Sequence, residues 1–421
     1  MRTVLLMLSQ CPHDPASGAA RVMRTVCELL ASPPSNRSGK PLYEPSRVVA
    51  VATTATEARE PLDAPEFLRE AGLSIHIQDQ PGARVITALS PGGAEYRLLD
   101  TGPHNAWSWE PTHEEAFERL FARTLDQHRP DALFFFGERQ GEVRRALAAR
   151  AAGAAVVFAL QNLAYHNPRS FDHVDAVITP SRFAADVYRR RLGIACTPIL
   201  PPMVLGDVLV PPADRAPDRL VFVNPVPEKG LMLFIALADL LGERRPDIRI
   251  LLIESRGGAD DVLRAAASAG VDLARHPSIE FARRVPRPRD FLAVARALIA
   301  PSIVEETAGL VVGESLVNGI PPIVSPRGAL PETAGAGGFV LPLPPALLRD
   351  PHAALAAADV APWAALVERL WDSRSFYDQC AARAKTAGKP WLPAAVAPRY
   401  AEVFASARRG AGVFAGPPAN P

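Results

Sequence analysis

Apolar residues fall along this chain in short runs, and between the runs they recur at helical spacing. The short runs have the length and composition of buried parallel strands, and the stretches between them have the period of amphipathic helices. We interpret as strands residues 1–8, 47–53, 74–78, 96–99, 132–136, 154–160 and 175–181, and then 220–223, 248–253, 279–281, 298–300, 322–325 and 339–341. Strands that alternate with helices in this way predict an α/β fold built on parallel sheets.

The length of the chain and one proline-rich stretch predict two domains. The 421 residues exceed what a single hydrophobic core ordinarily holds. Residues 198–216 contain five prolines and no helical periodicity, which is typical of an interdomain linker. We therefore predict one Rossmann-like α/β domain over residues 1–200 and a second over residues 217–361. Residues 410–421 are rich in glycine and proline and are predicted to form a flexible tail.

Composition and charge argue against several classes of protein. Apolar residues make up 48% of the chain and charged residues 22%, which predicts folded domains rather than a disordered chain. The net charge of +1 gives no reason to expect nucleic acid or an anionic membrane as a partner. The apolar run at residues 1–8 is too short for a signal peptide or a membrane span, so no transmembrane segment is expected.

The cysteines argue against a metal site and against a disulfide framework. They lie far apart and form no C-x-x-C pair: Cys11, Cys27, Cys196 and Cys380. Small buried thiols in a reducing compartment are the simplest interpretation, and they favour a cytoplasmic protein.

Residues 301–333 carry the densest group of candidate functional side chains. The pattern predicts a strand end, a loop with two adjacent carboxylates, a helix that opens at Ala308-Gly309, and a second strand at residues 322–325. Glu306 and Glu314 are then about two helical turns apart and can line one wall of a cleft. The first N–H groups of the helix, around Ala308, Gly309 and Leu310, suit an anion such as a phosphate. The alternative is that Glu306 is an ordinary helix-start acid and Glu314 a solvated helix position.

This stretch resembles a known donor-site signature. The pattern E-E-x(2)-G-L-x(3)-E-x(4)-G-I-P over residues 305–321, followed by Ile-Val-Ser, is similar to that of family 4 retaining glycosyltransferases, which have the GT-B fold. The resemblance implies that Glu306 faces the hydroxyl groups of the transferred sugar and that Glu314 holds the ribose of the nucleotide. It also implies two Rossmann-like domains that face each other across a cleft, with residues 362–408 returning to the first domain.

A second candidate for phosphate binding is Lys229. It lies at the head of a predicted helix, directly after the strand at residues 220–223, where a cation can neutralise a diphosphate. The resembling family has Lys-Gly here and an arginine several residues earlier. This chain instead has Asn224 in that neighbourhood, and Arg256, in the sequence E-S-R-G-G, is a candidate substitute. Taken alone, Lys229 would be interpreted as a solvated lysine, but its combination with Glu306 favours the phosphate role.

The first domain offers weaker candidates. Gly18 lies in the loop after the first strand, where the resembling family has one or two glycines opposite the diphosphate; the alternative is a plain turn. His13 and Asp14 share that loop and are expected to be solvated, with contact to an acceptor as the alternative. His166 lies in the exit loop of the strand at residues 154–160, close to where the family has a histidine that contacts the donor sugar or the acceptor; Gln161 and Asn162 are alternatives at this strand end.

Two further loops have side chains that suit a ligand. Residues 100–112 contain two tryptophans and a histidine, which predict either a platform for a sugar or an apolar acceptor, or anchors into the core. Residues 283–284 are both arginine and are expected to be solvated, with contact to a nucleotide base as the alternative.

The activity that the resemblance implies is the transfer of a sugar, with retention of configuration, from a nucleotide diphosphate sugar to a small-molecule, glycan or lipid-linked acceptor. Lys229 and the N–H groups near Gly309 would stabilise the departing phosphate while Glu306 orients the sugar. This scheme requires no metal and no cofactor beyond the nucleotide sugar. Two alternatives remain: a nucleotide-sugar isomerase, and a catalytically inactive nucleotide-sugar-binding protein of the same fold, which the missing arginine favours.

Overall fold

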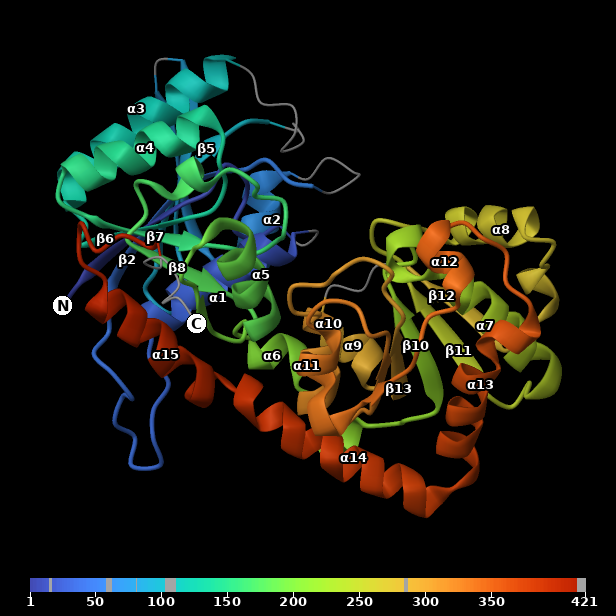
Figure 1. The fold of residues 1–421 in the computed structure, drawn as a ribbon. Helices are drawn as coiled ribbons and strands as arrows, with labels where there is room; N and C mark the ends of the chain where they lie inside the picture. Colours follow the sequence, from blue (N-terminus) through green and yellow to red (C-terminus); the bar gives the residue numbers. More distant parts are fainter. Residues whose placement is uncertain (15–16, 58–62, 81, 103–110, 284–286, 415–421) are drawn as a thin grey trace, which may run out of the picture. The chain divides into compact units, whose positions relative to one another are not determined.

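The computed structural model describes residues 1–14, 17–57, 63–80, 82–102, 111–283 and 287–414 (Figure 1). The chain forms two compact units. Unit 1 consists of Met1–Pro202 together with Pro393–Pro421, and unit 2 consists of Met203–Leu392. Each unit is a largely parallel sheet covered by helices, which confirms the predicted pair of Rossmann-like domains. No helix in the described part of the chain is both long enough and apolar enough to cross a membrane.

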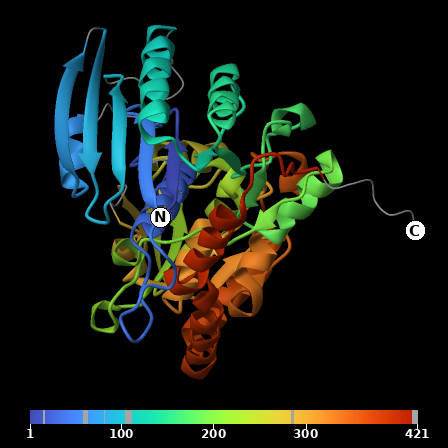
Figure 2. The ribbon, with the colours of Figure 1, turned by 90° about the vertical axis from the view of Figure 1, so that its left-hand side faces the viewer.

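In the described part of unit 1, nine strands form one sheet in the order β3-β4-β5-β2-β1-β6-β7-β8-β9. Their bounds are β1 (Thr3–Met7), β2 (Arg47–Thr53), β3 (Ser74–Gln80), β4 (Ala83–Leu89), β5 (Glu95–Asp100), β6 (Ala132–Phe135), β7 (Ala155–Ala159), β8 (Ala176–Thr179) and β9 (Thr197–Pro198). Strand β4 is antiparallel to both of its neighbours, and the other pairs are parallel. Figure 2 shows β3, β4 and β5 in lighter blue at one edge of this sheet. The central strands β1, β6 and β7 are buried on both faces, which explains their unbroken apolar sequences.

The helices of unit 1 cover this sheet. They are α1 (Gly18–Ala31), α2 (Ala64–Glu70), α3 (Pro111–His128), α4 (Gln140–Ala151), α5 (Arg182–Leu192), the short 3₁₀ helix η1 (Pro168–Phe171) and α15 (Pro393–Ser406). Helix α5 shows how the local sequence fixes an end: the Ser181 hydroxyl accepts a hydrogen bond from the Ala184 N–H at 3.1 Å, and Gly193 ends the helix in a left-handed conformation.

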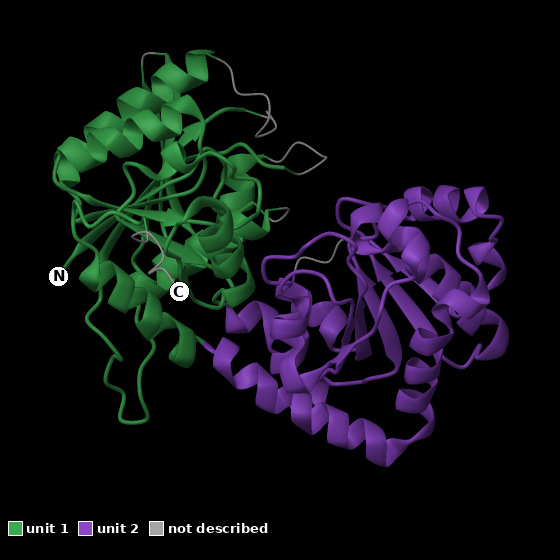
Figure 3. Cartoon of the chain, in the orientation of Figure 1, with its two compact units in different colours: residues 1–202, 393–421 green, residues 203–392 purple. Residues whose placement is uncertain are grey.

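The C-terminal segment of the chain belongs to unit 1, but it returns later than the sequence suggested. Helix α15 packs against α1, whereas residues 362–392 lie within unit 2 (Figure 3). Residues 410–414, predicted to be part of a flexible tail, instead pack on unit 1. The Gly410 N–H donates to the buried Asp175 carboxylate at 2.7 Å, and the Val413 carbonyl accepts from the Ala195 N–H at 2.7 Å. Residues 415–421 lie outside the described residues.

In the described part of unit 2, six parallel strands form a sheet in the order β12-β11-β10-β13-β14-β15. Their bounds are β10 (Arg219–Val223), β11 (Arg249–Ile253), β12 (Ile279–Ala282), β13 (Ala295–Ala300), β14 (Pro322–Val324) and β15 (Phe339–Val340). The chain proceeds outward from β10 to β12 in one direction and then outward from β13 to β15 in the other. The strand order therefore reverses between β10 and β13, which is the place where ligands bind in sheets of this kind.

Helices cover both faces of the unit 2 sheet, with α7, α8 and α13 on one side and α10 and α11 on the other (Figure 1). The bounds are α6 (Leu205–Val208), α7 (Leu231–Arg244), α8 (Ala259–Ser268), α9 (Pro288–Leu292), α10 (Leu310–Val317), α11 (Leu330–Ala334), α12 (Pro345–Arg349), α13 (Ala357–Asp372) and α14 (Arg374–Gly388), with 3₁₀ turns η2 (Pro212–Asp214), η3 (Pro227–Lys229), η4 (Leu273–Arg275), η5 (Gly335–Gly337) and η6 (Lys389–Trp391). The predicted linker at residues 198–216 thus contains a short helix, α6. Helix α7 fills the core, where Phe234 stacks on Phe222 with ring centroids 4.5 Å apart.

The four cysteines are free thiols. Three of them are buried and Cys196 is partly buried, in agreement with the interpretation as small apolar residues. Burial raises the pKa of the Cys11 thiol to about 12, so this side chain stays protonated near neutral pH.

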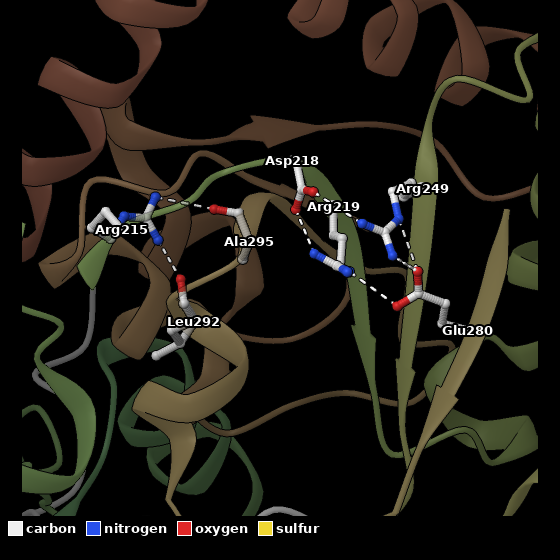
Figure 4. Close-up of polar contacts among 7 residues, drawn as sticks. All are labelled: Arg215, Asp218, Arg219, Arg249, Glu280, Leu292 and Ala295. Carbon is white, nitrogen blue, oxygen red and sulfur yellow. Dashed lines mark hydrogen bonds and ion pairs between the residues drawn. The ribbon is translucent and has the colours of Figure 1, made fainter. Parts of the chain in front are cut away.

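At the amino ends of the unit 2 strands, arginine–carboxylate pairs join three neighbouring strands (Figure 4). Arg219, at the start of β10, donates to Glu280 of β12 at 3.1 Å, and Arg249, at the start of β11, donates to the same carboxylate at 2.9 Å. Asp218 accepts from both arginines, at 2.6 and 3.4 Å. Beside them, Arg215 donates to two backbone carbonyls. Ion pairs therefore hold this end of the sheet together, and Arg215, Arg219 and Arg249 each have a partner.

We expect Glu280→Gln to lower the stability of unit 2 by about 0.5 to 1 kcal/mol, because the pairs are partly exposed. Burial opposes ionisation of Glu280, but the hydrogen bonds and charges of Arg219 and Arg249 outweigh it and lower its pKa. A lowered pKa stabilises the fold above the pKa of an unfolded-chain glutamate and loses this effect as the pH falls through the lowered value. Thermal unfolding should thus separate wild type from Glu280→Gln at pH 7 and bring them together at acid pH.

The matched control is Glu368→Gln on α13, which removes a carboxylate that makes no ion pair among the described residues. Equal effects of the two substitutions at pH 7 would show that the arginine pairs of Glu280 add nothing to stability.

Candidate functional site

The carboxyl edge of the unit 2 sheet gathers most of the residues that the sequence singled out. Loops follow β10, β11, β13 and β14 at this edge, and they begin at Asn224, Glu254, Pro301 and Ser325. Because the strands are parallel, these four loops meet around the reversal between β10 and β13. Side chains that are distant in sequence are thereby brought to one place.

An ion pair bridges the reversal point. Lys229, at the end of η3 after β10, pairs through Nζ with Oε1 of Glu306, in the loop after β13. The Ser302 hydroxyl donates to the same carboxylate oxygen at 2.8 Å. The side chains of Lys229 and Glu306 are 25% and 16% exposed, so the pair is shielded but within reach of a ligand. An incoming anion would compete with Glu306 for Lys229, and it would meet a cation that is already held in position.

The loop that carries Glu306 is fixed from both neighbouring strands. The Ile303 N–H donates to the Glu228 carbonyl at 2.9 Å, which ties the loop to the one after β10. From the β14 side, Arg327 Nε donates to the Ile303 carbonyl at 2.7 Å, and the Ala329 N–H donates to the Glu306 carbonyl at 2.7 Å. The Glu306 backbone is consequently anchored independently of its side chain.

Two glycines allow these close approaches. Gly328 has φ of +62°, and a Cβ there would collide with the backbone N and O of Glu306 and lie 2.8 Å from the Glu305 carbonyl carbon. Gly309, with φ of +73°, precedes the first residue of α10, and a Cβ there would lie 2.6 Å from Cδ2 of Leu330. A side chain at either position would displace the loop or the start of the helix.

Helix α10 opens where the sequence predicted, at Leu310 directly after Gly309. Its first N–H groups have no partner inside the helix, as at any helix start, and the partial positive charge there favours an anion. Glu306 lies in the preceding loop, bound to Lys229, and is therefore not an acid of the first helical turn. Glu314 lies about one turn into the helix and is only 5% exposed. The alternative that Glu314 is a solvated helix position is therefore wrong.

Asn224 contacts Arg256, the residue that the sequence analysis offered as a substitute for the arginine missing near position 224. Asn224 follows β10 in a left-handed conformation, with φ of +63°. Its side-chain oxygen accepts from the backbone N–H of Arg256 at 3.1 Å, and the glycine after Arg256 packs tightly on the Pro225 carbonyl. Asn224 thus holds the loop after β11, and this loop presents the exposed side chain of Arg256 at the carboxyl edge.

The two site residues predicted in unit 1, Gly18 and His166, are both exposed. Gly18 is the first residue of α1, which is capped by the Ser17 hydroxyl, and His166 lies in the loop after β7. Both residues belong to unit 1, whereas the group around Lys229 belongs to unit 2. The roles of Gly18 and His166 stay predictions of the family resemblance.

The expectation that His13 and Asp14 are solvated is wrong. His13 is 6% exposed and Asp14 is 1% exposed, because both fold inward beneath the loop after β1. Arg24 donates to Nδ1 of His13 at 2.7 Å, and Asp14 accepts from the Glu57 N–H at 2.7 Å. Burial, and then the charge of Arg24, lower the pKa of His13 well below its usual range. Both side chains are therefore part of the interior of unit 1.

Parts of two predicted loops lie outside the described residues. These are Arg284 and residues 103–110, which include both tryptophans of the aromatic loop. Arg283, next to this gap, is exposed, as expected for a solvated arginine.

Sequence reasoning missed three residues of this edge: Ser302, Arg327 and Gly328. Each follows the end of a parallel strand by two to four residues, and residues at that position lie next to a ligand crevice. The position of these residues just after strand ends is the sequence signal that could have identified them. No sequence signal predicts that Ser302 and Lys229 bind the same oxygen of Glu306.

Residues 217–370 match the model of the family described as glycosyl transferases group 1. The match covers most of unit 2 and includes the whole group around Lys229 and Glu306. The family recognised from the donor-site signature is thereby confirmed. No curated protein sequence matches the chain.

Solved structures extend the similarity to both units of the chain. HepE from Anabaena, in complex with UDP and glucose, is 15% identical with a TM-score of 0.63, and the match covers 96% of this chain and 99% of that one. Sucrose-phosphate synthase from Thermosynechococcus elongatus is 15% identical with a TM-score of 0.65, over 96% and 98% of the two chains. WaaG, a glycosyltransferase involved in lipopolysaccharide biosynthesis, is 12% identical with a TM-score of 0.60, over 96% and 100%. The fold is therefore GT-B, as the sequence predicted.

We expect Gly328→Ala to destabilise unit 2 by about 1 to 3 kcal/mol more than Gly270→Ala. Both substitutions place an alanine at a positive φ, but a Cβ at Gly270 meets nothing within 4 Å, whereas a Cβ at Gly328 meets the Glu306 backbone. The difference between the two variants in urea-induced unfolding isolates the cost of that contact. If the two variants unfold alike, the close approach of Gly328 to Glu306 is not a constraint on the site.

Proposed function

We propose that the protein is a retaining glycosyltransferase that moves a sugar from a nucleotide diphosphate sugar to an acceptor. The observation that carries this proposal is the Lys229–Glu306 pair at the strand-order reversal, beside the first turn of α10. A cation and a helix start suit a diphosphate, and carboxylates suit the hydroxyl groups of a sugar and a ribose. One edge of the sheet would thus supply groups that bind the diphosphate, the sugar and the ribose of the donor.

The diphosphate would bind between Lys229 and the first N–H groups of α10. Its negative charge competes with Glu306 for Lys229, so binding frees the Glu306 carboxylate to accept hydrogen bonds from the sugar hydroxyls. Ser302, which already donates to Glu306, would keep that carboxylate in orientation. The buried Glu314 would accept from the ribose hydroxyls. Arg256, on the loop held by Asn224, would add the second positive charge that the family draws from an arginine.

In the proposed reaction, the bond between the anomeric carbon and the diphosphate oxygen breaks, and a bond from the acceptor oxygen to that carbon forms on the same face of the sugar. The proton of the acceptor passes to the departing phosphate oxygen, so no dedicated base is needed. Lys229 and α10 stabilise the negative charge that develops on the phosphate, which is the largest demand of the step. The scheme uses these groups instead of a metal, and we expect activity to withstand EDTA.

The neighbours point to a first donor to test, since the HepE structures contain UDP, UDP-glucose, or UDP and glucose. The acceptor class stays open among small molecules, glycans and lipid-linked sugars. A nucleotide-sugar isomerase would form product without any acceptor, and this separates it from a transferase.

A second candidate is a catalytically inactive nucleotide-sugar-binding protein. One observation favours it: the oxygen of the Asn224 side chain, at the place where the family has an arginine, is engaged in holding the backbone of Arg256. Such a protein would bind the donor but would neither transfer nor hydrolyse its sugar.

Calorimetry with UDP-, GDP-, ADP- and TDP-sugars tests donor binding. We expect one nucleotide series to bind, and both Lys229→Ala and Glu314→Gln to weaken it by more than about 1.4 kcal/mol, roughly tenfold. Lys385→Ala, an exposed lysine on α14, is the matched control and should bind as wild type does. Donor binding that is unchanged in Lys229→Ala would show that the diphosphate lies elsewhere.

Slow hydrolysis of the bound donor, with water as acceptor, tests catalysis without a known acceptor. We expect Glu306→Gln to reduce this rate by about 10²- to 10³-fold, because the carboxylate that orients the sugar is lost. Glu305→Gln alters the exposed neighbouring carboxylate and should retain the wild-type rate. The anomeric configuration of the released sugar, followed by NMR before mutarotation, should match that of the donor. Inversion would contradict the retaining mechanism, and an absence of turnover in wild type would favour the inactive binder.

A further inference from the structure

The chain passes between the two units twice, after Pro202 and after Leu392 (Figure 3). Inside unit 2, each passage is flanked by a short segment: residues 203–210, which contain α6, and residues 389–392, which contain η6. Both segments make specific contacts with a single helix, α10, whose first turn is the proposed phosphate site.

The segment after the first passage is tied to the end of α10. Asn318, directly after the last residue of the helix, donates from Nδ2 to the Val208 carbonyl at 3.0 Å. Its Oδ1 accepts from the Val210 N–H at 2.8 Å. Val208 and Val210 are 3% and 6% exposed, so these hydrogen bonds lie at a buried boundary. One side chain thus fixes two backbone groups of this segment.

The segment before the second passage is packed on the middle of α10. Trp391 is 2% exposed, and its ring lies so close to Gly313 that a Cβ at that position would be 2.7 Å from two ring carbons. Gly388, at the end of α14, meets the backbone of Leu316 and Val317 in the same way, at 2.6 Å. Glycines at positions 313 and 388 therefore let the helix and this segment approach to contact distance.

The two anchors lie on either side of a proposed donor residue. Glu314 follows Gly313, and its carbonyl accepts from Asn318 Nδ2 at 2.8 Å, so the side chain that holds residues 208 and 210 also holds the backbone of Glu314. Helix α10 has only eight residues, which is about 12 Å of helix. A shift of its first turn therefore moves both anchors with it, because close-packed contacts transmit displacement.

We propose that α10 couples occupancy of the donor site to both chain passages, and that Asn318 and Trp391 are the positioning residues of this coupling. The inference rests on the proposed function, since it takes the diphosphate to bind at the first turn of α10. Coupling of this kind is reciprocal. If ligand binding stabilises the two segments, a substitution that loosens the segments lowers the affinity for the ligand. If α10 only packed against these segments, it would stabilise the fold, but ligand binding would not change the stability of residues 203–210 and 389–392.

Hydrogen–deuterium exchange on the full chain tests the coupling. A nucleotide that binds, taken from UDP, GDP and ADP, should slow exchange in residues 203–210 and 389–392 of wild type by roughly threefold or more. In Asn318→Ala, the nucleotide should still bind, but the slowing at residues 203–210 should be lost while that at residues 389–392 persists. Asn167→Ala, which removes a side-chain hydrogen bond to the Arg169 N–H in unit 1, is the control and should respond as wild type does.

A second variant tests the coupling without any ligand. Gly313→Ala pushes the middle of α10 away from Trp391, and we expect it to speed exchange at residues 203–210, which are tied to the end of the helix, as well as at residues 389–392. Unchanged exchange at residues 203–210 in Gly313→Ala would overturn the proposal. So would equal nucleotide protection of that segment in Asn318→Ala and wild type. Failure of every nucleotide to bind would refute the proposed function, and the Gly313→Ala result would still decide the coupling.

Discussion

The ion pair of Lys229 and Glu306 is the interaction around which the candidate site of unit 2 is arranged. It joins the loop after β10 to the loop after β13, the two strands between which the order of the sheet reverses. Ligands bind where the strand order reverses, and here the pair crosses that point beside the backbone hydrogen bond from the Ile303 N–H to the Glu228 carbonyl. Ser302 shares the Glu306 oxygen, so the carboxylate is satisfied before any ligand arrives. Under the proposed function the site is organised in advance, and a ligand that brings its own negative charge would replace Glu306 as the partner of Lys229.

The two ends of the unit 2 sheet differ in how their charged side chains are paired. At the amino ends of the strands, Arg219 and Arg249 share Glu280, and the charges neutralise one another. At the carboxyl ends, Arg256 extends from its loop into solvent and Lys229 is paired with a single carboxylate. Charges that are fully paired hold the strands together, whereas charges left available at a crevice attract a ligand. A parallel sheet permits this division because all of its strands end on the same side.

Helix α10 is positioned by close approaches at glycines. Gly309 starts it, Gly313 receives the ring of Trp391, and Gly328 lets the next loop touch the backbone of Glu306. Each contact needs the absence of a Cβ, so the position of the helix is set to within a few tenths of an ångström by packing. That precision suits a helix whose first turn is proposed to bind a phosphate and whose end holds the chain as it enters unit 2.

The sequence by itself determined the features that arise from neighbouring residues: the alternation of strands and helices, the two domains, the start of α10 after Gly309, and the spacing of Glu306 and Glu314. These follow from local periodicity and from backbone preferences. Only the tertiary structure decided that Lys229 meets Glu306, 77 residues away, and that Asn224 holds the loop of Arg256. It also decided that His13 is buried. The physical reason is that contacts between distant residues depend on strand order and on the packing of whole elements, and no local pattern encodes those.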